Sequence, residues 1–220
     1  KNLDYDIEKS FIPVAMIANV PQVLVVNPQR VSARNAKEFI ELMKKNPGKY
    51  NFASAGSGTV HHLAGELFKI QTGTFITHIP YRGAGPAMND LLAGQIDLEF
   101  DGLATSAPQI NAGKLVAIAV ASSKRSTAIP NVPTFKEAGL PDFEVSTWYS
   151  VFAPAGTPKP IVDKMIAEVQ KALNTPKLKA IWEKSGSDAP NMYGETFGKQ
   201  VRADVARWSG VVKKSGATLD

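Results

Sequence analysis

The sequence predicts an α/β protein built around a parallel sheet. Over residues 50–121, short apolar runs of strand length alternate with segments in which apolar side chains recur every three or four residues, the spacing of a helix with one buried face. Turns rich in glycine and proline separate these segments. Such alternation indicates parallel strands joined by right-handed crossovers. The turns that follow successive strands then lie at one edge of the sheet, where ligands bind.

The composition excludes several classes of protein. The 220 residues are 44% hydrophobic and 20% charged, as in globular proteins, and no apolar run approaches the roughly 20 residues that a membrane span needs. The formal charge is +5, but the lysines are scattered without interleaved aromatic residues, so no nucleic-acid partner is expected. The absence of cysteine excludes disulfides, thiolate metal sites and thiol chemistry, and fits either the cytosol or the periplasm.

The first 50 residues predict two strands and a helix. The strands are Phe11–Ala18 and Gln22–Val26, with a turn containing Pro21 between them. Ser32 is expected to cap the helix, which ends at Pro47-Gly48. The polar start at Lys1 is neither an initiator methionine nor a signal peptide, so the chain is expected to be a processed or truncated product.

The stretch around which the chain is organised is residues 50–68. It predicts a strand at Tyr50–Ala53, a turn at Ser54–Thr59 and a helix from Val60 onward, with Thr59 as the N-cap. Glycines in the turn leave backbone N–H groups exposed, and the positive end of the helix dipole lies beside them. Such a turn favours an anion. An ordinary β–α turn without a ligand is the alternative interpretation.

The rest of the chain continues the alternation and then changes character. Two further turns, at residues 81–85 and 101–103, should share a rim with the turn at 54–59, and this convergence favours an anion site. The three closing helices outnumber the strands available to cover them, which suggests that part of a second domain lies outside the chain. The later elements are expected at Thr74–Ile79, 86–94, Ile96–Phe100, Ala104–Ala112, Leu115–Ala121, Phe143–Phe152, Lys159–Leu173, Lys177–Lys184 and Thr196–Lys214.

The turn Gly56-Ser-Gly58 does not match the common nucleotide or nucleophile motifs. The third glycine of a dinucleotide fingerprint is replaced by His61, and no Gly-Lys-Ser/Thr of a P-loop follows. The nucleophile elbow of serine hydrolases would need glycine where Ala55 stands. The sequence therefore gives no catalytic set and no cofactor motif.

Two groups of polar residues remain open to more than one interpretation. Of His61 and His62, at least one is expected to be a capping or surface residue, while the other could donate to an anion; a histidine-based metal site is not expected, since the chain has three histidines in all. Asp97, Glu99 and Asp101 share one face of a strand and could hold a hard cation. Because burying them unpaired is costly, Asp97 and Glu99 are expected at an exposed margin.

Arg82 is the one cation within the three rim turns of the sequence. It could bind a carboxylate of a ligand in a bidentate pair, or form a salt bridge with Asp101 instead. Trp148 and Tyr149 either line a cleft or belong to the core.

Five motifs in the same order give the chain a resemblance to one family. It resembles the Bug-type extracytoplasmic solute receptors, the substrate-binding components of tripartite tricarboxylate transporters. The resemblance spans essentially the whole chain. The motifs are Ala53-Ser-Ala-Gly-Ser-Gly-Thr with His62-Leu, Pro80-Tyr-Arg-Gly-Ala-Gly-Pro-Ala, Leu91-Leu-Ala-Gly-Gln-Ile-Asp97, Pro130-Asn-Val-Pro-Thr with Glu137-Ala-Gly-Leu-Pro, and Phe152-Ala-Pro-Ala-Gly-Thr-Pro158.

The resemblance implies a periplasmic binding protein of type II, with two α/β domains that close on a ligand. Residues 1–19 and 147–220 would form part of domain 1, which is incomplete because an N-terminal region and the signal peptide lie outside the chain, and residues 20–146 would form domain 2. It also implies a ligand site formed by Ser57, Gly58, Thr59, His62, Tyr81, Arg82, Gly83 and Asp101.

The expected function is capture of a small organic carboxylate in the periplasm and its delivery to membrane transporter subunits by a monomeric, non-catalytic receptor. Closure about residues 20–26 and 145–152 would bury the ligand. Tricarboxylates, dicarboxylates, acidic amino acids and aromatic acids all remain open, because backbone amides recognise a carboxylate whatever carries it. The alternatives are an enzyme that uses Asp101 or His62 as a general base on a carboxylated or phosphorylated metabolite, and a chain that binds nothing.

Overall fold

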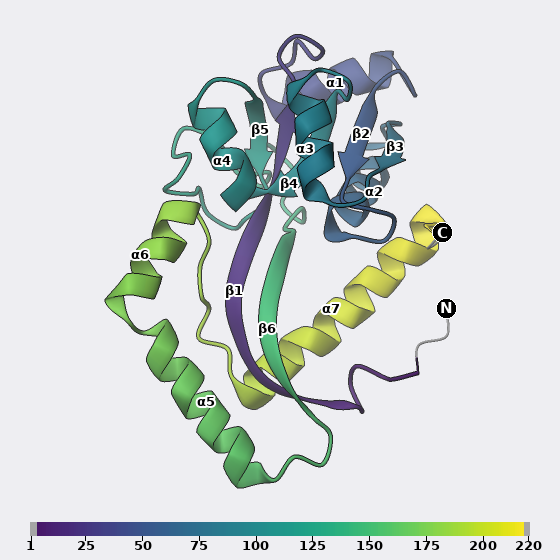
Figure 1. The fold of residues 1–220 in the computed structure, drawn as a ribbon. Helices are drawn as coiled ribbons and strands as arrows, with labels where there is room; N and C mark the ends of the chain where they lie inside the picture. Colours follow the sequence, from purple (N-terminus) through teal and green to yellow (C-terminus); the bar gives the residue numbers. More distant parts are fainter. Residues whose placement is uncertain (1–3, 218–220) are drawn as a thin grey trace.

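The structure is a computed structural model and describes residues 4–217 (Figure 1). The elements are β1 (Phe11–Val26), α1 (Ala36–Lys45), β2 (Asn51–Ser54), α2 (Val60–Thr72), β3 (Thr77–Pro80), α3 (Ala84–Leu92), β4 (Leu98–Gly102), α4 (Leu103–Asn111), β5 (Val116–Val120), β6 (Ser146–Pro154), α5 (Lys159–Leu173), α6 (Pro176–Ser185) and α7 (Gly194–Ser215).

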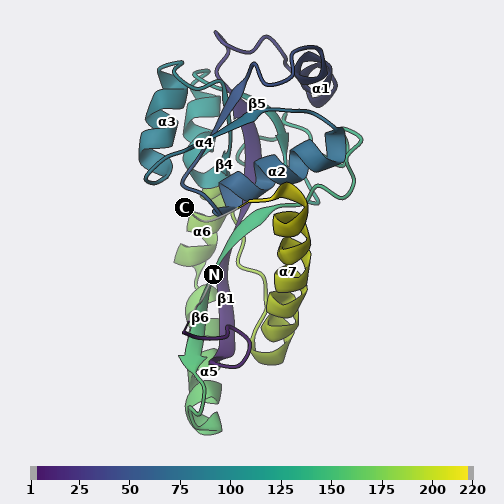
Figure 2. The same cartoon turned by 90° about the vertical axis from the view of Figure 1, so that its right-hand side faces the viewer.

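The chain forms two parts that share β1 (Figures 1 and 2). We call residues 22–145 the upper lobe; its strands lie in the order β3-β2-β4-β1-β5, with α1–α4 around them. We call residues 11–21 and 146–215 the lower arm, in which β6 pairs with β1 and α5–α7 lie alongside. The end of α7 reaches the upper lobe, where Val211 joins the core beside α2 (Figure 2). The domain boundaries at residues 19/20 and 146/147 stay a prediction.

The first strand is continuous, so the prediction of two strands broken at Pro21 is wrong. Residues up to Pro21 pair with β6, and residues from Gln22 onward pair with β4 and β5. Proline has no N–H to donate. It is tolerated here because Pro21 lies where the strand changes partners, and the ladder resumes with the bond from Gln22 N to Val145 O.

The sheet is mixed rather than wholly parallel. β2 is parallel to both β3 and β4, as predicted. However, β1 lies between β4 and β5 and is antiparallel to both. The prediction missed this because β1 precedes the alternating region by more than 20 residues, and local periodicity carries no information on such distant pairing.

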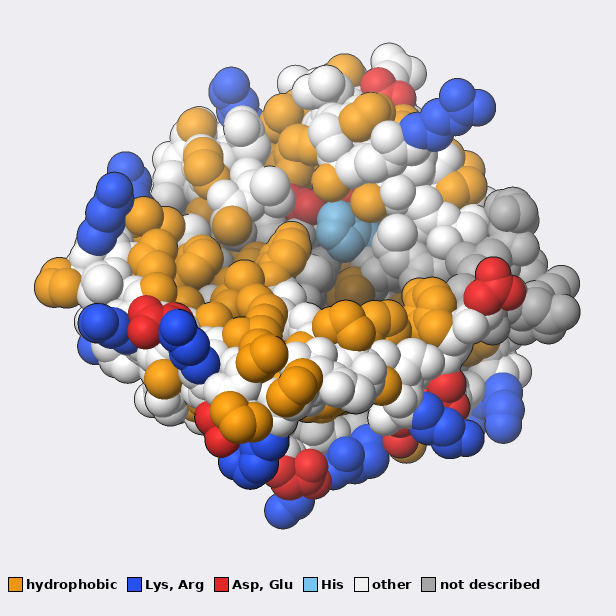
Figure 3. All heavy atoms as spheres, turned by 60° about the horizontal axis from the view of Figure 1, so that its bottom comes forward, with side chains coloured by type: hydrophobic (Ala, Val, Ile, Leu, Met, Phe, Trp, Pro, Cys, Tyr) orange, Lys and Arg blue, Asp and Glu red, His pale blue; other side chains and the backbone are white. Residues whose placement is uncertain are grey.

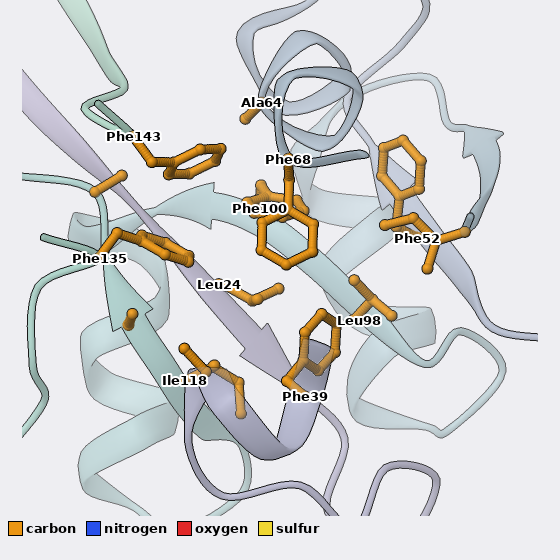
Figure 4. Packing of buried hydrophobic residues seen from close by; sticks show 14 of the residues in the cluster. Leu24, Phe39, Phe52, Ala64, Phe68, Leu98, Phe100, Ile118, Phe135 and Phe143 are labelled. Carbon is orange, nitrogen blue, oxygen red and sulfur yellow. The ribbon is translucent and has the colours of Figure 1, made fainter. Parts of the chain in front are cut away.

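Helices cover both faces of the sheet in the upper lobe, and β1 distributes its side chains between them. Leu24 and Val26 join one cluster with α1 and α2, while Val23 and Val25 join another with α3 and α4. This is the period-two alternation of a strand buried on both faces. The first cluster is the main core (Figure 4). Its phenylalanines are Phe39, Phe52, Phe68, Phe100, Phe135 and Phe143, whose rings meet edge to face or at a tilt.

Two helix starts differ from the prediction. The N-cap of α1 is Asn35, not Ser32: its side chain accepts a hydrogen bond from Glu38 N, and Glu38 accepts one from Arg34 N in return. These reciprocal bonds satisfy two amides at the helix start. Thr59 does occupy the N-cap position of α2, but its hydroxyl donates to Gly56 O instead of accepting from a helix amide.

Candidate ligand-binding site

Three helices begin at one edge of the sheet. Helices α2, α3 and α4 follow β2, β3 and β4, which are adjacent and parallel, so the carboxyl ends of these strands lie side by side. Within residues 4–217 no side chain caps any of the three. Uncapped helix starts leave backbone donors and a positive dipole end for an anion. The predicted convergence of the three turns on one rim is confirmed.

Backbone hydrogen bonds tie the first two turns together. Tyr81 N donates to Ser54 O over 3.0 Å, and Gly83 N donates to Ala55 O over 3.2 Å. Gly83 precedes α3 with a φ of 114°, a conformation that favours glycine. The starts of α2 and α3 are therefore held in a fixed relation, which is the preorganisation that a binding site needs.

Two of the backbone amides predicted to bind the ligand are already paired within the protein. The expectation of unpaired N–H groups across Ser57–Thr59 is therefore wrong for Gly58 and Thr59. Gly58 N donates to Nδ1 of His62 over 3.0 Å, and Thr59 N donates to Gly56 O over 3.2 Å. The amides of Val60 and His61, one residue further into the helix, have no partner within the described part of the chain. The donor set therefore lies slightly deeper in α2 than the sequence suggested.

His62 has a structural role in the described fold. Its ring is buried and stacks on His78, with ring centroids 3.8 Å apart and planes 5° apart. His78 Nε2 in turn lies 2.6 Å from Ser54 Oγ. By accepting from Gly58 N, His62 fixes the turn that precedes the N-cap residue of α2. Its role as a ligand residue stays a prediction.

His61, by contrast, lies at the rim between two carboxylates. Its Nδ1 is 3.2 Å from Glu99 Oε1, and its Nε2 is 3.9 Å from Asp101 Oδ1. The side chain of His61 is 13% exposed, that of Asp101 2% and that of Glu99 fully buried. Asp101 Oδ2 accepts hydrogen bonds from Thr105 Oγ1 and Ser106 Oγ, both at 2.5 Å, at the start of α4.

Burial and charge shift the pKa values of this group. Burial acts to lower the pKa of His61, but the bond to Glu99 and the charges of Asp101 and Glu99 outweigh it, so the pKa is raised above its usual value. Burial raises the pKa of Glu99, and the charge of Asp101 adds to the rise, while His61 opposes it. Both shifts reflect negative charge gathered in a region with little water.

The expectation that Asp97 and Glu99 lie at an exposed margin is wrong, since both are buried. Asp97 is compensated, because it accepts from Arg30 Nε over 3.0 Å and from Asn51 N over 2.8 Å. Glu99 and Asp101 point to the face of β4 opposite to Leu98 and Phe100, under the starts of α2 and α4. The sequence showed that these carboxylates share one face of the strand. It did not show that the starts of two helices cover Glu99 and Asp101, because that depends on tertiary structure.

The second turn carries the other predicted ligand residues. Tyr81 is half-buried and its hydroxyl donates to Asp90 Oδ2 over 2.8 Å, within α3; burial and this bond raise the pKa of Tyr81 to about 12. Arg82 is exposed and forms no ion pair or hydrogen bond within residues 4–217, so the alternative of a salt bridge to Asp101 is not found there. Arg82 remains a cation available to a ligand.

Replacing Tyr81 with phenylalanine is expected to lower the free energy of unfolding by about 1 kcal/mol, because it removes the hydrogen bond that ties the second turn to α3. Urea unfolding measures the loss as a lower midpoint at constant slope. Tyr149→Phe is the matched control, since Tyr149 is 55% exposed, and it should change the value by less than about 0.5 kcal/mol. Equal losses in the two variants would show that the Tyr81 hydroxyl has no special role.

The surface of the molecule is hollowed on the face that Figure 3 turns towards the viewer. Figure 3 shows a histidine at the floor of the hollow, acidic side chains beside it and apolar side chains around it.

A separate cavity of about 750 Å³ lies between the upper lobe and the lower arm and contains none of the predicted ligand residues. Two of its charged groups are engaged: Asp204 accepts from Trp148 Nε1, and Arg207 donates to Glu144 O. Trp148 therefore lines this cavity, while Tyr149 is exposed. We place the candidate site at the rim.

This architecture defines a class of protein. The chain superposes over its whole length on a solved structure described as a periplasmic transporter, with a TM-score of 0.91 and 44% identity, and covers 73% of that chain. The fold is that of the two-domain periplasmic binding proteins, as predicted. Among the described residues, no helix combines the length and apolarity needed to cross a bilayer.

The chain belongs to the TctC family, the tripartite tricarboxylate transporter family receptors, which it matches over residues 1–217. This confirms the predicted resemblance. It is 38% identical over 213 residues to the UPF0065 protein in the tcbD-tcbE intergenic region of Pseudomonas sp. (strain P51), covering 94% of this chain and 62% of that protein. The chain thus spans less than two thirds of the length of this relative.

Two solved relatives were determined with small acids. Rpa4515 of R. palustris, described with adipate, is 31% identical with a TM-score of 0.90; this chain is covered completely and that chain to 73%. MatC (Rpa3494) from Rhodopseudomonas palustris, described with bound malate, is 32% identical with a TM-score of 0.86, over 96% of this chain and 73% of that one.

Proposed function

We propose that the protein is a non-catalytic periplasmic receptor that captures a small organic acid and delivers it to the membrane subunits of a transporter. The observation that carries the proposal is the meeting of three uncapped helix starts at the edge of three adjacent parallel strands. Such a site binds carboxylate through fixed backbone donors. Family membership and the relatives described with adipate and malate support an organic acid as the ligand.

In the proposed complex, one carboxylate lies beside Ser57–Thr59 at the start of α2, where the amides of Val60 and His61 are available, and the turn at Tyr81–Gly83 orients the ligand. Domain 2 comprises residues 20–146, and residues 1–19 and 147–220 belong to domain 1. The two domains of a monomer close about residues 20–26 and 145–152. Because preorganised donors lose little entropy on binding, we expect micromolar affinity or better, on the order of −8 kcal/mol.

The structure gives less support to an enzyme. Of the two proposed bases, His62 accepts a backbone hydrogen bond at Nδ1, and Asp101 accepts two hydroxyl bonds at Oδ2. A general base needs an acceptor directed at the substrate; Nδ1 of His62 is taken by the backbone, and Oδ1 of Asp101 is directed towards His61.

Mass spectrometry of small molecules released from the full-length purified protein tests the proposal. We expect a dicarboxylic or other organic acid, and an increase in thermal stability when malate or adipate is added back. Proton NMR of the same mixture should show the acid unchanged after prolonged incubation. Release of nucleotides without any organic acid would contradict the receptor function, and turnover of the acid would favour the enzyme.

Replacing Arg82 with alanine is expected to weaken binding of the released acid by about 10- to 30-fold, since a charge-assisted hydrogen bond contributes about 1.5–2 kcal/mol. Isothermal titration calorimetry measures the change. Arg125→Ala is the matched control, because Arg125 is exposed and pairs with Glu137 in a loop away from the rim. Its affinity should stay within about twofold of the native value. The role of Arg82 is refuted if both variants bind like the native protein.

A further inference from the structure

The cluster of His61, Glu99 and Asp101 is built like a metal site. One ligand atom from each residue lies within 4.8 Å of the others. In a tetrahedral site with bonds of about 2.1 Å, two ligand atoms lie about 3.4 Å apart. The separation of 3.2 Å between His61 Nδ1 and Glu99 Oε1 is close to this value, while Asp101 Oδ1 lies 3.9 Å from the other ring nitrogen, Nε2. An ion binds one nitrogen of an imidazole, so a rotation of the His61 ring or of a carboxylate side chain would bring one ligand atom from each of the three residues onto one ion.

The charge of the cluster is not compensated by the rest of the described chain. Other buried acids there have a cation of their own: Asp97 pairs with Arg30, and Glu66 pairs with Lys69. Glu99 and Asp101 face no lysine or arginine within residues 4–217, and His61 is their one basic neighbour in that range. Two carboxylates against one imidazole leave an excess of negative charge, which is costly in a buried position.

A second observation points to a missing partner. Glu99 is fully buried, and its Oε2 has no hydrogen-bond partner in the described part of the chain, although Oε1 of the same group contacts His61. A buried carboxylate oxygen without a donor is rare in native proteins and calls for an explanation such as an ion. The unsatisfied atom belongs to the cluster itself.

The surroundings of Asp101 resemble the support that metal ligands receive. Thr105 and Ser106 both donate to Oδ2, which leaves Oδ1 directed towards His61. Carboxylates that bind metals are commonly held in this way by outer hydrogen bonds. The two hydroxyls come from the first turns of α4, so the orientation of Asp101 is fixed by the start of that helix.

We propose that His61, Glu99 and Asp101 form a binding site for a divalent transition-metal ion of the Zn²⁺ class. One imidazole nitrogen with two carboxylate oxygens suits Zn²⁺, Co²⁺ or Mn²⁺ better than Ca²⁺, which prefers six or more oxygen ligands. Three protein ligands leave at least one coordination position open. The site stands on the geometry of the cluster and does not depend on the proposed carboxylate receptor.

The test uses metal alone, without any organic acid, so its outcome is independent of the receptor function. Protein freed of metal by a chelator, and carrying no polyhistidine tag, is titrated with Co²⁺ and followed by visible absorption and by calorimetry with Zn²⁺. We expect one ion per chain and the absorption bands of Co²⁺ bound to nitrogen and oxygen. The absence of binding to the native protein would by itself overturn the proposal.

Variants locate the ion. Glu99→Gln and His61→Gln keep the size of each side chain and should weaken metal binding by at least about tenfold, and Ser106→Ala, which removes a positioning bond, by about tenfold. Glu66→Gln is the matched control, because Glu66 is also a buried carboxylate of the same region but has Lys69 as its partner. Native affinity in Glu99→Gln and His61→Gln, with the fold verified by circular dichroism, would place the ion elsewhere and refute the site.

Discussion

Replacing Phe68 with alanine is expected to destabilise the protein by about 3–5 kcal/mol. Phe68 is fully buried at the centre of the main core, where its ring lies 5.5–6.1 Å from those of Phe39, Phe100, Phe135 and Phe143. The substitution removes the contacts of one ring to four others and leaves a cavity that packed neighbours fill only in part. Because Phe68 lies on α2, the start of that helix at the rim should also lose order.

Denaturant unfolding followed by tryptophan fluorescence measures this loss. Phe75→Ala is the matched control, since Phe75 is 55% exposed and its ring lies beside Lys69 and Gly48 at the surface. That change should cost less than about 1 kcal/mol. Similar losses in the two variants would mean that the aromatic cluster is not the main source of stability in the upper lobe.

The second large effect is expected from adding a single methyl group at Gly65. A Cβ built there would lie 2.3 Å from Cε2 and 2.6 Å from Cζ of Phe52, whose ring is fully buried in β2. Neither the ring nor the helix can move without disturbing the core, so Gly65→Ala should destabilise the protein by about 2–3 kcal/mol. Gly65 is therefore required by the close approach of α2 to the sheet.

Gly210→Ala is the control for this prediction, and it should stabilise the protein. Gly210 also lies within a helix, α7, but a Cβ there meets nothing within 4 Å. Alanine has the higher helix propensity, so this variant should gain about 0.5–1 kcal/mol. Thermal or urea unfolding of both variants distinguishes the two cases. A neutral Gly65→Ala would show that α2 and β2 can separate at little cost.

Much of the upper lobe could be predicted because its signals are local. The apolar spacing from Val60 to Phe68 defines α2, and the glycines at 56, 58, 83 and 94 mark turns and helix ends. The shared rim follows from the rule that turns after parallel strands lie at one edge.

The failures concern contacts between distant residues. Pro21 indicated a break, but the change of partners along β1 depends on strands about 80 to 130 residues further on. The burial of Glu99 depends on the starts of two helices, which no pattern in β4 reveals. The amide of Gly58 is taken by a ring four residues away, and a side-chain direction of this kind is not encoded in spacing alone.

The structure places His61, rather than His62, against the acidic residues at the rim. The resemblance favoured His62, which the structure describes as stacked on His78 and bonded to the backbone. His61, at the next position, meets both carboxylates of the cluster. Adjacent residues on a helix point about 100° apart, so the first turn of α2 has two distinct environments.

The partner change along β1 has a consequence for folding. Its sixteen residues form one hydrogen-bonded ladder with β6 and two more with β4 and β5. Removing this strand would expose backbone groups of both the upper lobe and the lower arm at once. The upper lobe and the lower arm should therefore unfold in one cooperative step rather than as separate units. A peptide that replaced β1 in its pairings would unfold both regions.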